Sequence, residues 1–331
     1  MSTSTISVAM TTFNGCPYLE QQLASAASQL RLPDEIVIGD DQSTDETARV
    51  VERFAAAHSI PTHFTRNATR LGSTVNFERT ITRCRGDIVV FADQDDVWLP
   101  QKLARLEAAF ASDPRVDYAF SDGFLIDPEG KRVEGTIFSS MGFEDGERQR
   151  FRSGAPFEVL LKRNVVAGAA LAVKRASLER LMPFEPGWVH DYFIACCLAL
   201  VGRGVVIDEP LIEYRRHASQ QIGVARPNVG DAVSLARRQG AAFCRQQLRN
   251  FEGLEPRFRA LGIAPDHPVF QTLREKVRFL RARAQMREAP WLAPALLWRS
   301  FRRGDYRRYS VGWRQTLLDM IAVGHAVRSP G

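Results

Sequence analysis

Apolar runs alternate with amphipathic stretches along the first half of the chain. The segments ISVAMTTF and EIVIGDD have the continuous apolar character of strands buried on both faces. Between them, apolar residues recur at helical spacing from Leu19 to Leu30, which predicts a β-α-β unit. Ser43 and Glu46 have the spacing of a capping box, so a second helix is predicted to start just after the second strand.

The same alternation continues through PTHFTRN, DIVVFAD and VDYAFSDGFLI, with helices predicted near 75–83 and 101–112. It favours a mostly parallel sheet with helices on both faces. In open sheets of this kind, ligands bind beyond the carboxyl ends of the strands. Polar clusters follow three predicted strands, and we expect them to converge on one cleft. These clusters are Thr11 to Asn14, Asp40 with Asp41, and Asp93 to Asp96.

The second half of the chain has a different pattern. It is mixed from Val165 to His217, and after about Gly230 it is helical, rich in arginine and interspersed with aromatic residues. We therefore predict a catalytic domain over residues 1–225 and a helical C-terminal extension over 226–331. Pro227 and Gly230 mark the expected linker.

Composition places the chain among ordinary soluble proteins. Of its 331 residues, 45% are hydrophobic and 25% are charged, and the formal net charge is +6. Five cysteines without metal-ligand spacing indicate reduced thiols and a reducing compartment. The N-terminus has no basic leader or secretory segment, and the longest apolar stretches are too short to cross a bilayer, so we expect a cytoplasmic protein.

An acidic motif, Asp93-Gln94-Asp95, follows the strand DIVVFAD. Two carboxylates about 5 Å apart repel by roughly 3 kcal/mol, so a bound cation would offset the repulsion. Mg²⁺ or Mn²⁺ takes hard oxygen ligands and is commonly shared with substrate phosphates. The alternative is a solvated acidic turn that caps the helix beginning near Pro100. No GxGxxG or P-loop motif is present, so another element must hold any phosphates.

Two further candidates lie near the end of the mixed region. Asp191 precedes an apolar helix, where it is either an N-cap or a general base within reach of an acceptor hydroxyl. His217, in YRRHASQQ, is a surface residue, a phosphate contact or a further metal ligand beside Asp93 and Asp95. The residues alone leave these alternatives open.

Four segments together carry a resemblance to a known family. Taken together, and in their order along the chain, these segments resemble family 2 glycosyltransferases of the GT-A fold. The resemblance is to the bacterial rhamnosyltransferase-like group and covers roughly residues 5–220. The resemblance implies a Rossmann-like α/β sheet. The segments are ISVAMTTFNG, EIVIGDDQSTDET, GDIVVFADQDDVWLPQKL and HDYFIACCLALVGRGVVIDEPLIEYRRH.

The resemblance also implies roles on the donor side. Thr11 and Asn14 match the turn that lines the nucleotide pocket, and Asp41 matches the residue that hydrogen-bonds the base. Asp93 and Asp95 match the motif that meets the ribose and the metal-bridged diphosphate.

On the acceptor side, Asp191 matches the catalytic base of inverting members. Gln42 stands where the family usually has glycine, TFN replaces TYN, and HDYF replaces HDWW. These departures bear on the fit of the base and the acceptor.

We therefore predict a metal-dependent, inverting glycosyltransferase. It moves a sugar from a nucleotide-diphosphate donor to a hydroxyl of a cell-surface polysaccharide or a lipid-linked glycan. The alternatives are a nucleotidyltransferase, which usually adds a Gly- and Lys-rich phosphate loop, and a non-catalytic nucleotide- or glycan-binding module.

The C-terminal segment WLAPALLWRSFRRGDYRRYSVGWRQTL interleaves aromatic residues with arginines. One interpretation is a helical extension whose aromatic residues pack on the catalytic domain and whose arginines are merely solvated. The other is peripheral contact with the anionic inner face of a membrane, with the rings at headgroup depth. No nucleic-acid-binding module is recognised, so we expect no nucleic-acid partner.

Overall fold

The structure is a computed structural model that describes residues 4–217 and 240–328. The chain divides into two compact units. The first unit comprises residues 1–156, 165–184 and 188–225, and the second comprises 157–164, 185–187 and 226–331. The predicted linker at Pro227 and Gly230 lies outside the described residues, so a domain boundary at 225 stays a prediction.

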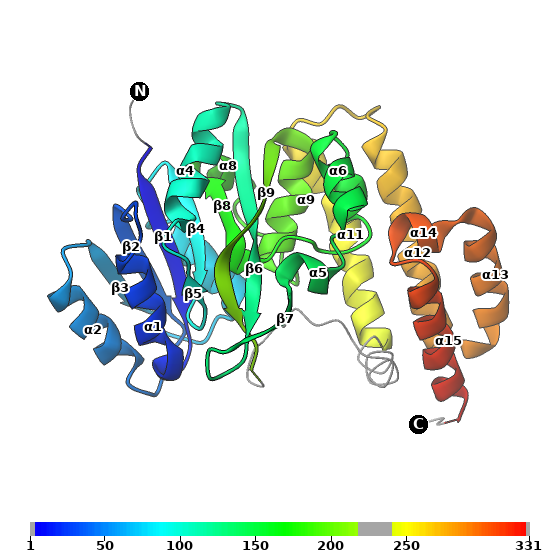
Figure 1. Ribbon diagram of the computed structural model, residues 1–331. Coiled ribbons are helices and arrows are strands. Elements are labelled where there is room, and N and C mark those ends of the chain that lie inside the picture. Colours follow the sequence, from blue (N-terminus) through cyan, green and yellow to red (C-terminus); the bar gives the residue numbers. More distant parts are fainter. Residues whose placement is uncertain (1–3, 218–239, 329–331) are drawn as a thin grey trace. The chain divides into compact units, whose positions relative to one another are not determined.

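The first unit is built on one sheet (Figure 1). Its strands are β1 (Ile6–Thr12), β2 (Glu35–Asp40), β3 (Thr62–Arg66), β4 (Ile88–Asp93), β5 (Val97–Trp98), β6 (Val116–Ile126), β7 (Arg132–Thr136), β8 (Leu171–Lys174) and β9 (Arg203–Arg215). Their order is β3-β2-β1-β4-β8-β6-β9-β5, and β7 pairs with β6. β3, β2, β1 and β4 are parallel, as are β6 and β9, whereas β8 and β5 run antiparallel to their neighbours.

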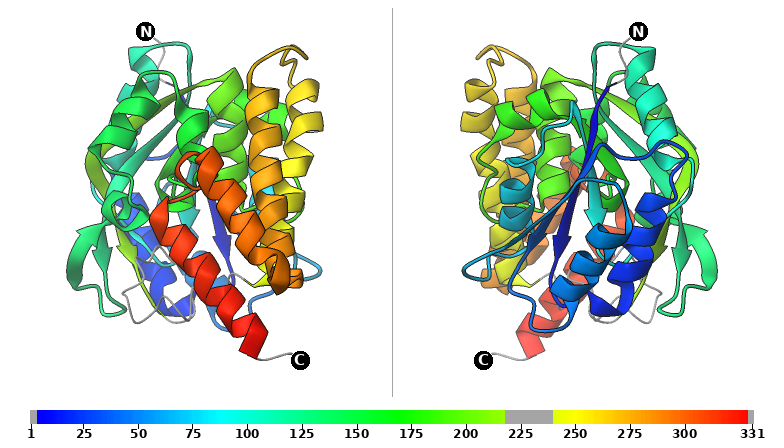
Figure 2. Two further views of the ribbon diagram at one scale, coloured as in Figure 1. Left: turned by 90° about the vertical axis from the view of Figure 1, so that its right-hand side faces the viewer. Right: turned by 90° about the vertical axis from the view of Figure 1, so that its left-hand side faces the viewer.

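Helices cover both faces of this sheet (Figure 2). They are α1 (Cys16–Ala27), α2 (Thr47–Ala57), α3 (Ser73–Ile81), α4 (Lys102–Ser112), α5 (Ile137–Met141), α6 (Asp145–Arg152), η1 (Gly168–Ala170), α8 (Arg175–Leu181) and α9 (His190–Val201). Every residue of β1 and β2 is buried, because strands covered on both faces exclude water from both. The predicted capping box is wrong: α2 begins at Thr47, and the Ser43 hydroxyl bonds the Asp40 carboxylate instead.

The second unit is helical. Its helices are α7 (Pro156–Leu160), α11 (Ala241–Ala260), α12 (Val269–Glu288), η3 (Pro290–Leu292), α13 (Ala293–Arg303), α14 (Asp305–Tyr309) and α15 (Trp313–Arg328). The first residue of α7, Pro156, belongs to the first unit. Buried Phe251, Phe258, Phe270 and Phe279 from α11 and α12 supply much of its core. Among the residues that the structure describes, no helix has the length and apolar character needed to span a bilayer.

Asp319 is a buried charge in the second unit. Its carboxylate accepts hydrogen bonds from the guanidinium groups of Arg283 (3.0 Å) and Arg287 (2.6 Å), the Tyr306 hydroxyl (2.9 Å) and the Gln315 amide (2.9 Å). Burial alone would raise the pKa of Asp319, but the charges of Arg283 and Arg287 lower it. This network joins α12, α14 and α15.

Candidate active site

The carboxyl ends of β1, β2 and β4 lie side by side. Thr12 at the end of β1 is in register with Asp40 in β2, and the buried Thr11 is in register with Asp93 in β4. The expected convergence of these strand ends is therefore confirmed. It places the polar residues that follow each strand at one edge of the sheet, where open α/β sheets bind their ligands.

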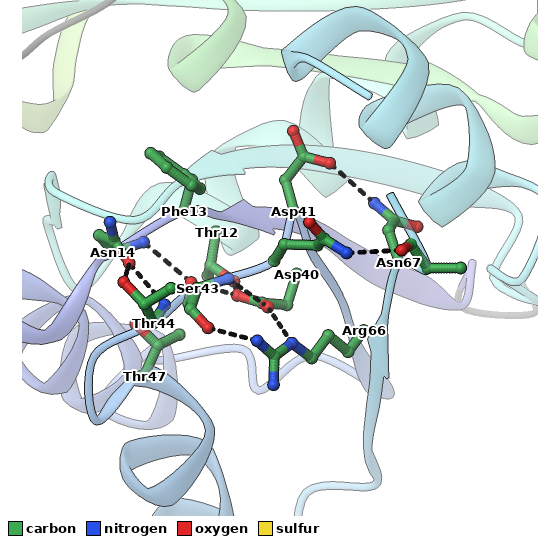
Figure 3. Close-up of polar contacts among 12 residues, drawn as sticks. Thr12, Phe13, Asn14, Asp40, Asp41, Ser43, Thr44, Thr47, Arg66 and Asn67 are labelled. Atoms are coloured by element: carbon green, nitrogen blue, oxygen red, sulfur yellow. Dashed lines mark hydrogen bonds and ion pairs between the residues drawn. The ribbon is translucent and has the colours of Figure 1, made fainter. Parts of the chain in front are cut away.

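A hydrogen-bond network joins the turn after β1 to the turn after β2 (Figure 3). The Asp40 carboxylate accepts from the Thr12 hydroxyl (2.8 Å) and the Ser43 N–H (2.9 Å). The Asn14 N–H donates to the Ser43 hydroxyl, and the Asn14 side-chain oxygen accepts from the Thr44 N–H, both at 2.8 Å. Asn14 has a φ of 49°, which asparagine tolerates better than most residues. The exposed Asn14 is thus fixed by both turns.

Asp41 is buried and anchors the loop after β3. Its two oxygens accept from the N–H groups of Leu71 (2.7 Å) and Gly72 (2.8 Å) and from the Asn67 amide (3.2 Å). A carboxylate has about four lone-pair sites. Asp41 therefore has capacity for one further donor.

Gln42 follows Asp41 and stands where the family usually has glycine. Gln42 has a φ of 66°, in the left-handed region where glycine is unstrained. Its side-chain amide donates to the Ala68 carbonyl at 2.5 Å, which ties Gln42 to the same loop. In that loop, the Arg70 guanidinium lies 3.7 Å from the centre of the Phe13 ring. Arg70 thus brings a positive charge to the turn after β1.

Gln94, the middle residue of the acidic motif, ties the end of β4 to the end of β1. Its side-chain oxygen accepts from the Phe13 N–H (2.8 Å), and its side-chain nitrogen donates to the Phe13 carbonyl (3.1 Å). Gly15 lies close to this amide, because an added Cβ there would come within 2.4 Å of the Gln94 side-chain oxygen. The two flanking aspartates are thus held in a defined turn.

Asp95 pairs with His217 beyond the end of β9. The His217 Nε2 lies 2.7 Å from Asp95 Oδ2, and both side chains are largely buried. The Asp95 carbonyl accepts from the buried Arg215 guanidinium (2.7 Å), and the Arg215 N–H donates to the Asp96 carboxylate (3.0 Å). The end of β9 therefore supports the turn that carries Asp95, and the residues just after β9 supply a partner for the Asp95 side chain.

Asp93 lacks such support. Across residues 4–217 and 240–328, no hydrogen-bond donor contacts its carboxylate, and burial together with the charges of Asp95 and Asp191 raises the pKa of Asp93 to about 7. Burial and the charges of Asp95 and Asp93 also raise the pKa of Asp96. This crowding fits a bound divalent cation, which would favour the ionised carboxylates.

The composition of the cluster also fits Mg²⁺ or Mn²⁺. Asp93 and Asp95 provide the oxygen ligands that these ions prefer, and His217 adds an imidazole. Among the described residues, no three His, Cys, Asp or Glu side chains are arranged to hold an ion on their own. An ion at this place would thus take further ligands from a substrate.

Asp191 lies in the first turn of α9 and is mostly buried. Val189, not Asp191, occupies the N-cap position, so the N-cap alternative for Asp191 is wrong. Asp191 Oδ2 accepts from the Gly168 N–H at 2.9 Å. Gly168 permits this approach, because an added Cβ would lie 2.8 Å from the Nε2 atom of His190 and 3.3 Å from Asp191 Oδ2.

Two further titratable side chains are buried in the first unit, and sequence reasoning missed the first of them, Lys102. Lys102 donates to the Ala169 carbonyl (2.6 Å) from the first turn of α4, lies 4.2 Å from the Trp98 ring, and has a pKa lowered to about 7 by burial. His190 packs against Phe77, and burial lowers its pKa to about 3, so its ring is neutral. The sequence signal for Lys102 was weak, since a lysine in a first helical turn is normally exposed.

Comparison with solved structures identifies the fold. A mannosyltransferase from Pyrobaculum calidifontis in complex with GDP-Man and Mn²⁺ is 20% identical, with a TM-score of 0.55 over 99% of this chain and 87% of that one. S. aureus TarS in complex with UDP-GlcNAc is 18% identical, with a TM-score of 0.54 over 91% of this chain and 92% of that one. The predicted GT-A fold is confirmed.

Comparison with curated sequences gives more similar relatives. An uncharacterized glycosyltransferase of Nostoc sp. is 28% identical over 223 residues, which are 65% of this chain and 65% of the relative. The dTDP-rhamnosyl transferase RfbG of Shigella flexneri is 33% identical over 228 residues, 65% of this chain and 73% of the relative. The chain thus spans just under two thirds of the Nostoc relative's length.

The sequence profile of glycosyl transferase family 2 matches residues 7–180. This region contains all but the first residue of β1, the strands β2 to β4, the acidic motif and the Gly168 turn. Because the match covers more than half of the chain, this protein belongs to glycosyl transferase family 2.

Proposed function

We propose that the protein is an inverting, metal-dependent glycosyltransferase that uses a nucleotide-diphosphate sugar. The observation that carries the proposal is the gathering of Asp93, Asp95 and Asp191, whose mutual influence appears in the raised pKa of Asp93. Asp93 ends β4, Asp95 lies in the turn that follows, and Asp191 comes from α9. Such a set provides ligands for a cation and a separate base.

On the donor side, the turns after β1 and β2 form the nucleotide site. Thr11 and Asn14 line it, and Asp41 accepts a hydrogen bond from the base through its remaining lone-pair capacity. Asp93 contacts the ribose and, with Asp95 and His217, would hold Mg²⁺ or Mn²⁺. When bound, such an ion stabilises negative charge on the departing diphosphate as a Lewis acid.

On the acceptor side, Asp191 is the general base. Its carboxylate accepts the proton of the acceptor hydroxyl as that oxygen attacks the anomeric carbon opposite the leaving diphosphate. The Gly168 N–H fixes Oδ2 of Asp191 and orients the carboxylate. One displacement inverts the anomeric configuration, and no covalent sugar–enzyme intermediate forms. The acceptor is a glycan hydroxyl of a cell-surface polysaccharide or a lipid-linked glycan, in keeping with the rhamnosyl transferase relative.

The test is incubation of the full chain with a panel of nucleotide sugars, including dTDP-rhamnose, GDP-mannose and UDP-GlcNAc. Free nucleoside diphosphate is measured with EDTA alone and after addition of Mn²⁺ or Mg²⁺. We expect release with one donor, loss of release in EDTA and recovery with the ion. Full activity in EDTA would refute the metal dependence.

A second incubation, with a nucleoside triphosphate and a sugar phosphate, separates the alternatives. A nucleotidyltransferase would join the sugar phosphate to the nucleoside monophosphate part and release pyrophosphate from the triphosphate, and a binding module would bind the donor without turnover in either incubation. NMR of the product reports the anomeric configuration, and retention of the donor configuration would refute the single displacement.

A further inference from the structure

The aromatic residues of the C-terminal segment fall into two groups. Tyr306 and Tyr309 are buried and pack against Phe279 within the second unit. The other four are highly exposed: Trp291 by 78%, Trp298 by 59%, Phe301 by 72% and Trp313 by 71%. These four therefore lie outside the core of the second unit. Contiguous exposed apolar surface on a globular protein usually marks an interaction site.

These residues form stripes on two helices. Trp298 and Phe301 lie three positions apart on α13, and Trp313, Leu317 and Met320 recur at a spacing of four and three on α15. The two helices lie side by side (Figure 1; Figure 2, left), and both contact η3, which carries Trp291. The stripes and Trp291 therefore belong to one region of the second unit.

The usual polarity of a surface helix is only partly kept on these helices, where Ala293 and Leu318 are buried but so are polar residues. Ser300 of α13 and Gln315 and Asp319 of α15 are buried, whereas Trp298 and Leu317 face outward. A surface helix of a globular protein normally places its apolar stripe inward. The outward stripes thus have no role in the core of the second unit.

The same region is positively charged. Between residues 290 and 324 the acidic residues are Asp305 and Asp319, and both are buried. The arginines at six positions are exposed, and the Arg302 guanidinium lies 4.9 Å from the centre of the Trp298 ring. These six are Arg299, Arg302, Arg303, Arg307, Arg308 and Arg314. Together with Trp291, Trp298, Phe301, Trp313, Leu317 and Met320, they form what we call the aromatic–arginine surface.

We propose that the aromatic–arginine surface docks on an anionic phospholipid bilayer. Tryptophan rings are favoured at the level of the lipid headgroups, aliphatic side chains such as Leu317 and Met320 gain from burial among the acyl chains, and arginines attract anionic headgroups. The mode of attachment is peripheral, by exposed faces of α13 and α15. It is independent of the transferase reaction.

Charge and side-chain type favour a bilayer over two other occupants. A second copy of the chain, related by a two-fold axis, would place arginines against arginines. A single-stranded nucleic acid would stack its bases on the aromatic rings, but Leu317 and Met320 offer no ring face for a base. An anionic bilayer is complementary to the aromatic rings, the aliphatic side chains and the arginines of this surface.

The test is co-sedimentation of the full chain with vesicles of phosphatidylcholine, with and without phosphatidylglycerol. We expect binding to the anionic vesicles at low salt and release at high salt. Changing Arg299, Arg302, Arg307 and Arg314 to Gln should lower the partition coefficient by about fivefold for each arginine removed. The control changes Arg53, Arg79, Arg83 and Arg85 to Gln, which removes the same charge from exposed positions of the first unit and should leave binding unchanged.

Tryptophan fluorescence tests insertion separately from electrostatic adsorption. Trp98 and Trp188 are buried, so quenching by lipids with brominated acyl chains reports Trp291, Trp298 and Trp313. We expect quenching in anionic vesicles and its loss when Trp298 and Trp313 are both changed to Ser. Equal sedimentation with neutral and anionic vesicles, sedimentation without quenching, or preferred binding to an oligonucleotide would each overturn the proposal.

Discussion

Asp93 in the first unit is partly buried and Asp319 in the second is fully buried, yet the surroundings of the two carboxylates are opposite. Asp319 accepts hydrogen bonds from two arginines, a tyrosine and a glutamine, and the arginine charges lower its pKa. Asp93 has no donor among the described residues, and burial and neighbouring carboxylates raise its pKa. A carboxylate whose hydrogen-bond donors all come from the protein serves stability. A carboxylate without such donors is a candidate for ligand binding.

Asp191→Asn, in the cluster of Asp93, Asp95 and Asp191, is expected to have the largest effect. The amide keeps the shape and an oxygen that can accept from the Gly168 N–H, but it removes the basicity. We expect turnover to fall by about 10² to 10⁴-fold with donor affinity unchanged. Single-turnover rates and donor titrations measure the two separately. Asp208→Asn, at an exposed carboxylate that pairs with Arg152, is the control, and normal turnover by Asp191→Asn would show that another group is the base.

Asp319→Asn should have the next largest effect, on folding. It leaves Arg283 and Arg287 buried without a counter-charge, which typically costs about 3–5 kcal/mol. Because the pKa of Asp319 is lowered, its stabilising contribution is present above the ordinary carboxyl pKa and is lost as the pH falls through the folded-state value. Urea unfolding and amide exchange of α12 and α15 measure the loss. The control is Glu288→Gln, which breaks the exposed pair with Arg245; an equal loss there would contradict the assignment.

Lys102→Met should move two properties of the candidate site in opposite directions. With a pKa of about 7, Lys102 is charged in about half of the molecules at neutral pH, and loss of this charge leaves the acidic cluster more negative, so we expect Mn²⁺ to bind about threefold more tightly. Loss of the bond to the Ala169 carbonyl loosens the turn that holds Asp191 through Gly168, so turnover should fall by about tenfold. Lys174→Met, which also removes a lysine bonded to a backbone carbonyl, should change neither. A fall in Mn²⁺ affinity would contradict this account of Lys102.

The smallest effect is a gain in stability from Asp93→Asn. Since the pKa of Asp93 is raised to about 7, the folded protein holds a proton that the unfolded chain has lost, and stability falls as the pH rises from about 4 to 7. We expect the variant in EDTA at pH 8 to melt about 2–4 °C above the wild type, the shift for 1 kcal/mol in a domain of this size. At pH 4 the two should melt together. A lower melting temperature at pH 8 would mean that the ionised carboxylate has a stabilising partner.

The hydrophobic pattern predicted the strands that carry this site, because the pattern of apolar residues within a short segment identifies a buried strand. Parallel strands end at the same edge of a sheet, so Asp40 and Asp93 could be placed together from the apolar runs that precede them. The start of α2 was predicted to within a few residues, but its cap was not. Ser43 bonds Asp40 and Asn14, and those partners lie in turns that only the folded sheet brings together.

The supporting residues could not be predicted, because their partners are distant in the chain. Lys102 meets a carbonyl 67 positions away, and Arg215 reaches an aspartate 120 positions away. Neither contact leaves a periodic signal. The outward stripes of α13 and α15 were similarly ambiguous, since periodicity identifies a helix face but not whether that face is buried.

The two bonds of Gln94 to Phe13 have a consequence for the thermodynamics of donor binding. Fixing the backbone of one flexible residue typically costs about 1–2 kcal/mol in conformational entropy. The turns after β1 and β4 are already joined by this amide. In the proposed function, the donor would thus meet turns that were ordered when the chain folded. Little configurational entropy remains to be lost there, and slow amide exchange at Phe13 in the ligand-free protein is the expected sign of this preorganisation.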